Sequence, residues 1–268
     1  MRYWGLLLLL GLWGCTPREL ITIKGSDTVL PVSQALAEAY LEKKATPLIS
    51  VTGGGSGVGI AALLNGDTDI AMSSRPLKLA ERLRLEAAQR TLIEDTIAWD
   101  VLAVCVHPQN PISHLSRENL VAIYTGAVTN WKELGGPDMP IVVYSRESSS
   151  GTFEFFREHV LRGKDFAPSV RFIPATGTLV QSIAQTPGAI GYLGIAYLNP
   201  TIKPLAISGG SNTPVLPAKN QAALASYPLA RPLFYYYDRD ARSRLAAFLD
   251  FIHSPEGKVV IEKVGYVP

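Results

Sequence analysis

Four short segments rich in glycine, serine and threonine carry the residues of this sequence best suited to hold a ligand. In each segment a predicted strand ends and a predicted helix begins at once. The segments are K-G-S-D-T-V at 24–29, T-G-G-G-S-G at 52–57, M-S-S-R at 72–75 and R-E-S-S-S-G-T at 146–152. The first turn of a helix offers backbone N–H groups without partners, and the aligned peptide dipoles add a partial positive charge there. These segments therefore predict binding of a small anion.

The side chains in these segments suit an anion with tetrahedral oxygens. Glycine lets the backbone approach closely, and Ser and Thr hydroxyls can donate hydrogen bonds. Arg146 and Arg75 add planar donors that are always charged. Each segment alone also has an ordinary structural explanation, since Ser and Thr cap helices and Gly makes turns. Arg146 can equally be a solvated surface charge, and Arg75 can brace Ser74 and a neighbouring carboxylate.

Motifs for nucleotide binding and serine hydrolysis do not fit the glycine-rich segment. The dinucleotide pattern G-x-G-x-x-G fails, because its last position falls on Val58 or Ile60. The glycines are not followed by the lysine of a P-loop. The pattern G-x-S-x-G around Ser56 also ends on Val58. A phosphatase or serine hydrolase using Ser56 or Ser150 stays an alternative, although neither serine has a histidine nearby in sequence to act as its base.

Short apolar runs alternate with helical patterns along the chain, which is typical of an α/β architecture. The predicted strands cover 20–24, 48–52, 69–73, 97–107, 141–144, 170–174, 189–193 and 232–237. Apolar residues at helical spacing predict helices over 32–40, 60–64, 120–124 and 245–252. Gly66 is expected to end the second of these, and Ser254-Pro255 to begin one more.

The strand predicted over 97–107 is long for a single strand, and Pro108 and Pro111 follow it. Such a segment is expected to leave one lobe and enter another, with the first crossing near Val101. A return crossing near 227–237 would let the last helices pack on the first lobe. The pattern thus indicates two lobes joined by two crossing strands.

The composition excludes a disordered chain and gives no electrostatic reason to expect nucleic acid as a partner. Charged residues make up 18% of the chain and hydrophobic residues 47%, which excludes a disordered chain. The formal net charge is +2, and no block of like charges gives a reason to expect nucleic acid as a partner. A bound anion must therefore be held by local groups.

The first residues have the pattern of an export signal. Residues 1–14 combine one positive charge with an apolar run too short to span a bilayer. The run L-W-G-C ending at Cys15 resembles the lipobox of bacterial lipoproteins, although its tryptophan departs from the usual small or β-branched residue. The resemblance implies an exported protein that palmitate and other acyl chains on Cys15 anchor to the membrane in the bacterial cell envelope. An ordinary secretory signal with an incidental cysteine is the alternative.

Neither a disulfide nor a metal site is predicted. Cys105 is the one cysteine left after Cys15, and it stands in an apolar run, so we expect a small core residue. The four histidines are scattered and none stands at metal-ligand spacing with another. No metal and no cofactor are expected.

Further motifs follow the four segments in a fixed order. They are P-G-A-I-G-Y at 187–192, Y-P-L-A-R-P at 227–232, S-P-E-G at 254–257 and G-Y-V-P at 265–268. Together with G-S-D-T-V-L-P at 25–31 and D-I-A-M-S-S-R at 69–75, they resemble the phosphate-binding subunits of bacterial phosphate ABC importers. The resemblance covers nearly all of the chain after the signal.

This resemblance implies a two-lobed α/β fold of the periplasmic-binding-protein type II superfamily, with two crossover strands as the hinge. It implies a monomer that is not an enzyme, binds inorganic phosphate between its lobes and delivers it to the permease subunits of an ABC transporter. The expected parts are the signal 1–14, a lipidated tether 15–19, lobe one in two pieces, 20–101 and 230–268, and lobe two 102–229.

The resemblance also implies a set of ligand-binding residues, carried over motif by motif. They are Ser26, Thr28, Val29, Ser56, Ser74, Arg75, Arg146, Ser150, Gly151 and Thr152. At Thr28 and Val29 the family brings a hydroxyl and a backbone N–H to the phosphate.

The third segment departs from the family pattern. Many members place an aspartate there that accepts the proton of hydrogen phosphate, whereas this chain has Ser74 followed by Arg75. A carboxylate that can only accept rejects sulfate, because sulfate carries no proton to donate. Asp27 or Glu147 could supply the missing carboxylate, or either could be a residue of the first helical turn that interacts favourably with the helix dipole. Sulfate, molybdate or tungstate binding and a surface scaffold are therefore kept as alternatives.

Overall fold

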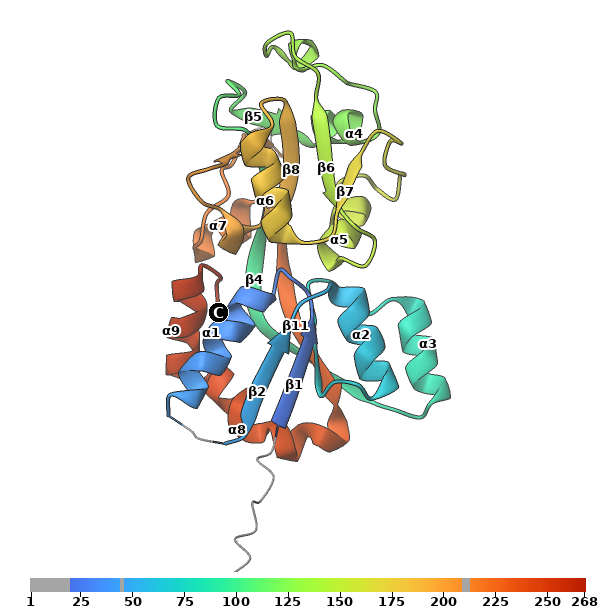
Figure 1. The fold of residues 1–268 in the computed structure, drawn as a ribbon, viewed down its shortest axis with the longest axis vertical. Coiled ribbons are helices and arrows are strands. Elements are labelled where there is room, and N and C mark those ends of the chain that lie inside the picture. Colours follow the sequence, from blue (N-terminus) through green and yellow to red (C-terminus); the bar gives the residue numbers. More distant parts are fainter. Residues whose placement is uncertain (1–19, 44–45, 209–212) are drawn as a thin grey trace, which may run out of the picture.

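The computed structural model describes residues 20–43, 46–208 and 213–268, which form two lobes stacked along the long axis of the molecule (Figure 1). The predicted signal, the tether and Cys15 lie outside the described residues. Two long strands run between the lobes (Figure 1). The two-lobed α/β architecture expected from the sequence is confirmed.

Lobe one contains a sheet in the order β2-β1-β3-β11-β4. Its strands are β1 (Leu20–Gly25), β2 (Leu48–Thr52), β3 (Ile70–Ser73), β4 (Leu92–Val106) and β11 (Ala230–Asp238). The first three pair in parallel, and β11 lies antiparallel between β3 and β4. Its helices are α1 (Leu30–Leu41), α2 (Ser56–Asn65), α3 (Leu79–Ala87), α8 (Arg242–His253) and α9 (Pro255–Val264).

Lobe two is built around the end of β4, which continues into a sheet in the order β4-β8-β6-β7. Its strands are β8 (Ala189–Gly194), β6 (Val142–Arg146), β7 (Arg171–Ile173), β9 (Lys203–Pro204) on β4, and the separate pair β5 (His114–Ser116) and β10 (Ala206–Ser208). Its helices are α4 (Arg117–Tyr124), α5 (Gly151–His159), α6 (Thr176–Gln185) and α7 (Gln221–Ser226). Short 3-10 turns are η1 (Trp131–Leu134), η2 (Ile195–Tyr197) and, in lobe one, η3 (Arg239–Ala241).

β4 changes partner halfway along its length. Its residues from Leu92 to Val101 pair with β11, and those from Leu102 to Val106 pair with β8. β11 begins opposite this point, since Ala230 pairs with Val101. One strand therefore belongs to the sheets of both lobes.

Apolar stripes and caps explain why the helices form where they do. Val32, Leu36 and Tyr40 of α1 are buried on one face, and each such side chain contributes about 1.5–3 kcal/mol relative to exposure. α2 ends at Gly66, whose φ of 84° suits glycine. Ser254 accepts a hydrogen bond of 3.1 Å from Gly257 N at the start of α9. The caps expected at Gly66 and Ser254 are confirmed.

Several elements differ from the sequence-based prediction, and two of them show why. β4 begins at Leu92 and not at 97, although its first five residues are exposed or half-buried. Pairing with the aromatic strand β11 holds this polar stretch, and Tyr236 Oη donates to Glu94 Oε2 at 2.8 Å. Helix α3 was not predicted because it buries only Leu85. Its start is held by Glu81, which accepts from Lys78 N at 2.7 Å.

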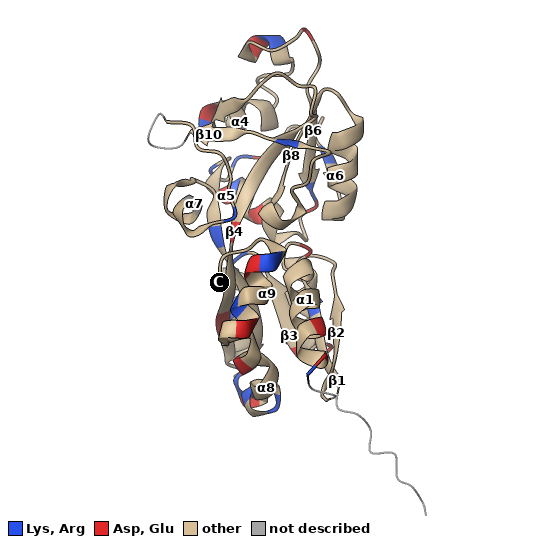
Figure 2. Cartoon of the chain, turned by 90° about the vertical axis from the view of Figure 1, so that its left-hand side faces the viewer, with Lys and Arg blue, Asp and Glu red and all other residues tan. Residues whose placement is uncertain are grey.

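The core includes the remaining cysteine, as predicted. Cys105 is fully buried and is a free thiol, and burial raises its pKa. Over the described ranges, none of the helices combines the length and apolar character needed to cross a bilayer. Residues of both charge signs occur along α8 and α9 (Figure 2), in keeping with the absence of like-charge blocks in the sequence.

Candidate functional site

The four glycine- and hydroxyl-rich segments meet between the lobes. Three of them follow β1, β2 and β3 of lobe one, and the fourth joins β6 to α5 in lobe two. Because β1, β2 and β3 are parallel neighbours, their carboxyl ends lie at one edge of the sheet. The backbone links the lobes here directly, since Gly57 N donates to Ser149 O at 2.9 Å.

Three serine hydroxyls of lobe one form the centre of this site. Ser26 Oγ lies 3.1 Å from Ser74 Oγ, and Ser56 Oγ lies 3.4 Å from Ser74 Oγ. Ser74 N also donates to Ser56 Oγ at 3.1 Å. All three side chains are buried. We call these three residues the serine cluster.

Gly151 brings the backbone of lobe two against the serine cluster. A Cβ atom at this position would lie 2.3 Å from Ser56 Oγ and 2.6 Å from Ser74 Oγ. Only a glycine permits so close an approach. The first residue of α5 therefore faces the hydroxyls of the opposite lobe.

The remaining hydroxyls of the fourth segment have two different roles. Thr152 Oγ1 lies 2.8 Å from Thr28 Oγ1 of lobe one, and both side chains are buried. Ser150 instead caps α5, because its Oγ accepts from Thr152 N at 3.2 Å.

Val29 is buried, and its N–H donates to Ser26 O at 3.0 Å within the loop. In this structure the N–H of Val29 thus bonds within its own loop and not to a hydroxyl of the serine cluster.

Arg146 is a buried charge that joins the two lobes. Its side chain is 2% exposed, which makes the solvated-surface alternative wrong. Its guanidinium forms an ion pair with Asp27 of lobe one and donates to Thr176 Oγ1. It also donates to the carbonyl oxygens of Ile173, at 3.2 Å, and Pro174.

Of the two carboxylates considered for the site, the structure brings only Asp27 to it. Asp27 is nearly buried, and besides Arg146 it accepts from Gly54 N at 2.9 Å. Glu147 is exposed on the loop before α5. The first carboxylate therefore lies among the site residues, and the second is a surface charge.

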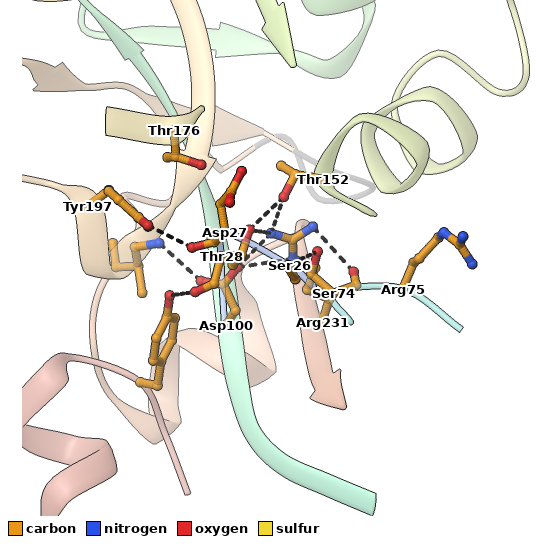
Figure 3. A network of polar contacts seen from close by, with 12 residues as sticks. Ser26, Asp27, Thr28, Ser74, Arg75, Asp100, Thr152, Thr176, Tyr197 and Arg231 are labelled. Carbon is orange, nitrogen blue, oxygen red and sulfur yellow. Dashed lines mark hydrogen bonds and ion pairs between the residues drawn. The ribbon is translucent and has the colours of Figure 1, made fainter. Parts of the chain in front are cut away.

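Arg75 turns away from the serine cluster (Figure 3). Its Nη1 and Nη2 donate to the two carboxylate oxygens of Glu81 at 2.8 and 2.7 Å. Although burial favours the neutral acid, hydrogen bonds from Arg75 and Lys78 N together with their charges hold the pKa of Glu81 below its ordinary value. This geometry corresponds to the bracing alternative and not to ligand contact.

The sequence-based list misses a second set of residues at this junction. Asp100 and Arg231 form a buried ion pair, with Arg231 Nη2 at 2.9 Å from Asp100 Oδ2 (Figure 3). Tyr197 Oη donates to Asp27 O at 2.7 Å across the lobes, and Tyr266 Oη donates to Thr28 O. The signal for the ion pair was a charged residue inside each of two apolar strands, where a lone charge is costly. The tyrosines gave no such signal.

The arrangement is suited to recognising an anion. The serine cluster, Thr28 and Thr152 present hydroxyls from both lobes, and Arg146 adds a buried positive charge. His159 of α5 contacts Phe155 O, and His253 contacts Asp95, so neither is paired with a serine of the site. Within the described ranges no group of His, Cys, Asp or Glu is arranged to hold a metal ion. Hydroxyl and guanidinium donors converging in this way suit an oxyanion.

Comparison with known proteins agrees with this geometry. A family model described as a PBP superfamily domain matches residues 16–256. The phosphate-binding protein PstS of Bacillus subtilis (strain 168) is 32% identical over 250 residues, which cover 92% of this chain and 80% of that protein.

Two solved structures share the whole fold. A phosphate ABC transporter substrate-binding protein from Clostridium perfringens, solved with bound phosphate, matches with a TM-score of 0.85 and 33% identity over 93% of this chain and 99% of that one. An ABC-type phosphate transport receptor from Vibrio cholerae matches with a TM-score of 0.73 and 33% identity over 92% and 99%.

Fold and site thus define a two-lobed substrate-binding protein. Proteins of this class take part in transport. Within the PBP superfamily, this chain belongs to the family of the PstS phosphate-binding proteins of ABC phosphate transporters.

Proposed function

We propose that this protein binds inorganic phosphate between its lobes, outside the cytoplasm, and delivers it to the permease of an ABC transporter. The observation that carries the proposal is the meeting of the serine cluster with Gly151 and Thr152 of the opposite lobe. The relatives named for phosphate binding or solved with phosphate support the choice of anion.

Phosphate would hold the two lobes together. An anion that accepts hydrogen bonds from Thr28 on one lobe and Thr152 on the other binds the closed form better than an open one. Only such a difference in affinity shifts the population toward closure. The permease then has a closed form to recognise, and this protein itself performs no covalent step.

We propose different roles for the ten residues selected from the sequence. Those that contact phosphate are Ser26, Thr28, Ser56, Ser74, Arg146, Gly151 and Thr152. Val29 shapes the first loop, Ser150 caps α5 and Arg75 braces the third loop through Glu81.

The lobe boundaries are part of the same proposal. We assign 20–101 and 230–268 to lobe one and 102–229 to lobe two. The change of partner of β4 between Val101 and Leu102, and the start of β11 at Ala230, support this division.

Titration calorimetry with phosphate, sulfate, molybdate and tungstate tests the choice of anion. We expect phosphate to bind most tightly, and phosphate at about 100 times its Kd to stabilise the folded protein by about 2.7 kcal/mol. Tighter binding of another oxyanion would transfer the proposal to that anion. A protein whose unfolding temperature responds to none of them would be a surface scaffold.

Anchoring through Cys15 is proposed from the sequence alone. We expect metabolically supplied radioactive palmitate to label the wild-type protein and the protein to fractionate with membranes as a monomer. The Cys15→Ser variant should lose both the label and the membrane association. A labelled Cys15→Ser protein would contradict the lipid anchor without affecting the proposed phosphate binding.

A further inference from the structure

A buried ion pair in the hinge lies directly behind the hydroxyls of the site. Arg231 of β11 and Asp100 of β4 stand opposite each other in the antiparallel ladder. Arg231 Nε and Nη2 donate to Asp100 Oδ2 at 3.0 and 2.9 Å, and their side chains are 1% and 0% exposed. Asp100 Oδ1 accepts from Ile195 N of lobe two at 3.0 Å. Each charge has a partner, which a buried charge requires.

Arg231 also contacts binding loops of both lobes (Figure 3). Its Nη2 donates to Thr152 Oγ1 at 3.0 Å and to Thr28 Oγ1 at 3.5 Å. Its Nη1 donates to Ser74 O at 3.4 Å. The Cζ atom lies 5.2 Å from the ring centre of Phe155, which holds the guanidinium from another side.

These contacts restrict the hydrogens of the two threonines. A guanidinium has donors and no acceptor, so Thr152 Oγ1 accepts from Arg231 Nη2 at 3.0 Å. The other Nη2 hydrogen goes to Asp100, so Thr28 Oγ1 at 3.5 Å receives a share of the hydrogen that Thr152 accepts. Their own hydrogens then point away from Arg231. Thr28 and Thr152 lie 2.8 Å apart, so at most one of the two hydrogens is used between them. An anion between the lobes can take the remaining hydrogen, and it takes both when it replaces the bond between the threonines.

We propose that Arg231, held by Asp100, is a positioning residue that makes Thr28 and Thr152 donate hydrogen bonds toward the anion. This inference rests on the proposed phosphate binding. A hydroxyl fixed as a donor favours an oxygen with free lone pairs and disfavours a protonated one. The pair also joins the two crossing strands, so the orienting charge stands at the hinge whichever lobe moves.

The test replaces both charges together, because removing one partner leaves an unpaired buried charge and strongly destabilises the fold. In Asp100→Leu/Arg231→Met we expect the phosphate Kd from calorimetry to rise about ten-fold or more, equivalent to about 1.4 kcal/mol. Circular dichroism checks that the variant is folded. The matched control is Arg90→Met/Asp238→Leu, which removes the pair at the far end of β11, joined at 3.0 Å. The control is expected to keep the wild-type Kd.

A mutant cycle separates positioning from a structural role. Thr152→Val should weaken phosphate binding in the wild-type protein and weaken it much less in Asp100→Leu/Arg231→Met, since the hydroxyl is then no longer oriented. Thr152→Ser keeps the hydroxyl and should keep the wild-type coupling. Wild-type affinity in the paired variant, or losses that simply add, would overturn the proposal.

If the paired variant does not fold, the Arg231→Lys variant tests the positioning role instead. Lysine keeps a charge beside Asp100 but lacks the planar fork that reaches several partners. We then expect weaker phosphate binding and a smaller cost of Thr152→Val, and unchanged affinity would refute the positioning role. A wild-type protein that does not bind phosphate would instead refute the proposed function itself.

Discussion

At the scale of single residues, the site depends on hydroxyls and one glycine, each of which would have an ordinary structural role in an exposed surface loop. Ser56 and Ser74 are selective here because they are buried and because Gly151 faces them without a side chain. Burial raises the cost of leaving any of these groups unpaired to about 1–3 kcal/mol. These residue types are common in proteins, and their burial together between the two lobes makes them a binding site.

Gly151→Ala should block the site. The new Cβ would overlap with Ser56 Oγ and Ser74 Oγ, and overpacking of this kind costs about 1–3 kcal/mol, which is about 5- to 150-fold in the phosphate Kd. Calorimetry measures the loss. The control is Gly177→Ala at the start of α6, where the added Cβ would meet no atom within 4 Å other than its chain neighbours and the backbone of its own helix. Equal Kd values for the two variants would contradict the close contact.

Asp27→Asn should weaken the rejection of sulfate. The carboxylate of Asp27 can only accept hydrogen bonds, whereas an amide can also donate to an unprotonated oxygen. In competition binding we expect sulfate to displace phosphate more readily in this variant than in the wild type. Glu147→Gln, at an exposed position of the neighbouring loop, is expected to compete as the wild type does. If sulfate competed better in Glu147→Gln and not in Asp27→Asn, Glu147 and not Asp27 would be the residue that rejects sulfate.

At the scale of elements, two segments that follow strands, one after β8 and one after β3, make contacts between the lobes. The short turn η2 of lobe two sends Tyr197 to the carbonyl oxygen of Asp27 in lobe one. Lys78 before α3 pairs with Glu154 of α5 at 2.6 Å. The lysine is half exposed, and exposed pairs contribute at most about 1 kcal/mol, so the buried bonds matter more for closure.

Tyr197→Phe should weaken phosphate binding by about 2- to 12-fold, because it removes one hydrogen bond between the lobes worth about 0.5–1.5 kcal/mol. The control is Tyr236→Phe, which removes a 2.8 Å bond to Glu94 inside lobe one. That variant should lower the unfolding temperature and keep the phosphate Kd. If Tyr236→Phe weakened binding as much as Tyr197→Phe, the effect would not come from closure.

The same tyrosine predicts how the stability of the folded protein depends on pH in the alkaline range. Burial and then the charge of Asp27 raise the pKa of Tyr197 to about 12, opposed by Arg146. The pKa of the folded state lies above the ordinary value of about 10, so the protonated phenol stabilises the folded form. This contribution is complete below about pH 10 and is lost as the pH rises through about 12. A phenolate absorbance titration of the wild type minus Tyr197→Phe should show this late step, and a step near pH 10 would contradict it.

At the scale of the whole molecule, the strands β4 and β11 connect the two lobes. β4 contributes to both sheets, and β11 crosses at the same level. We expect bending at these strands to change the separation of the binding loops. Hydrogen bonds such as the one from Gly57 N to Ser149 O then form only when the lobes are together.

Phosphate should therefore make the molecule more compact. We expect the radius of gyration from small-angle X-ray scattering to fall when phosphate is added to phosphate-free protein. The Gly151→Ala variant should not show this change, because closure would press its methyl group against the serine cluster. A radius that is the same with and without phosphate in the wild type would argue against closure by ligand.

Much of this molecule was predictable from local signals. Alternating strands and helices, the cap at Gly66 and the buried Cys105 follow from spacing and residue type, which act over short distances. Polar Glu94 in β4 and the exposed helix α3 were missed, because pairing with a distant strand and capping by Glu81 hold them. The partner of β4 lies far along the chain, which a local pattern cannot show, and α3 buries only Leu85 and so has no apolar stripe to reveal it.

The sequence by itself determined the α/β architecture and the loops that can hold an anion, since hydrophobic periodicity and glycine, serine and threonine at strand ends are local properties. The tertiary structure alone decided which charges take part. It placed Arg75 on Glu81, joined Arg146 to Asp27 and brought Arg231 and Asp100 together behind Thr28 and Thr152. The physical reason is that a charge selects its partner by distance and burial in space, and residues 131 positions apart in the chain meet only when both strands are folded.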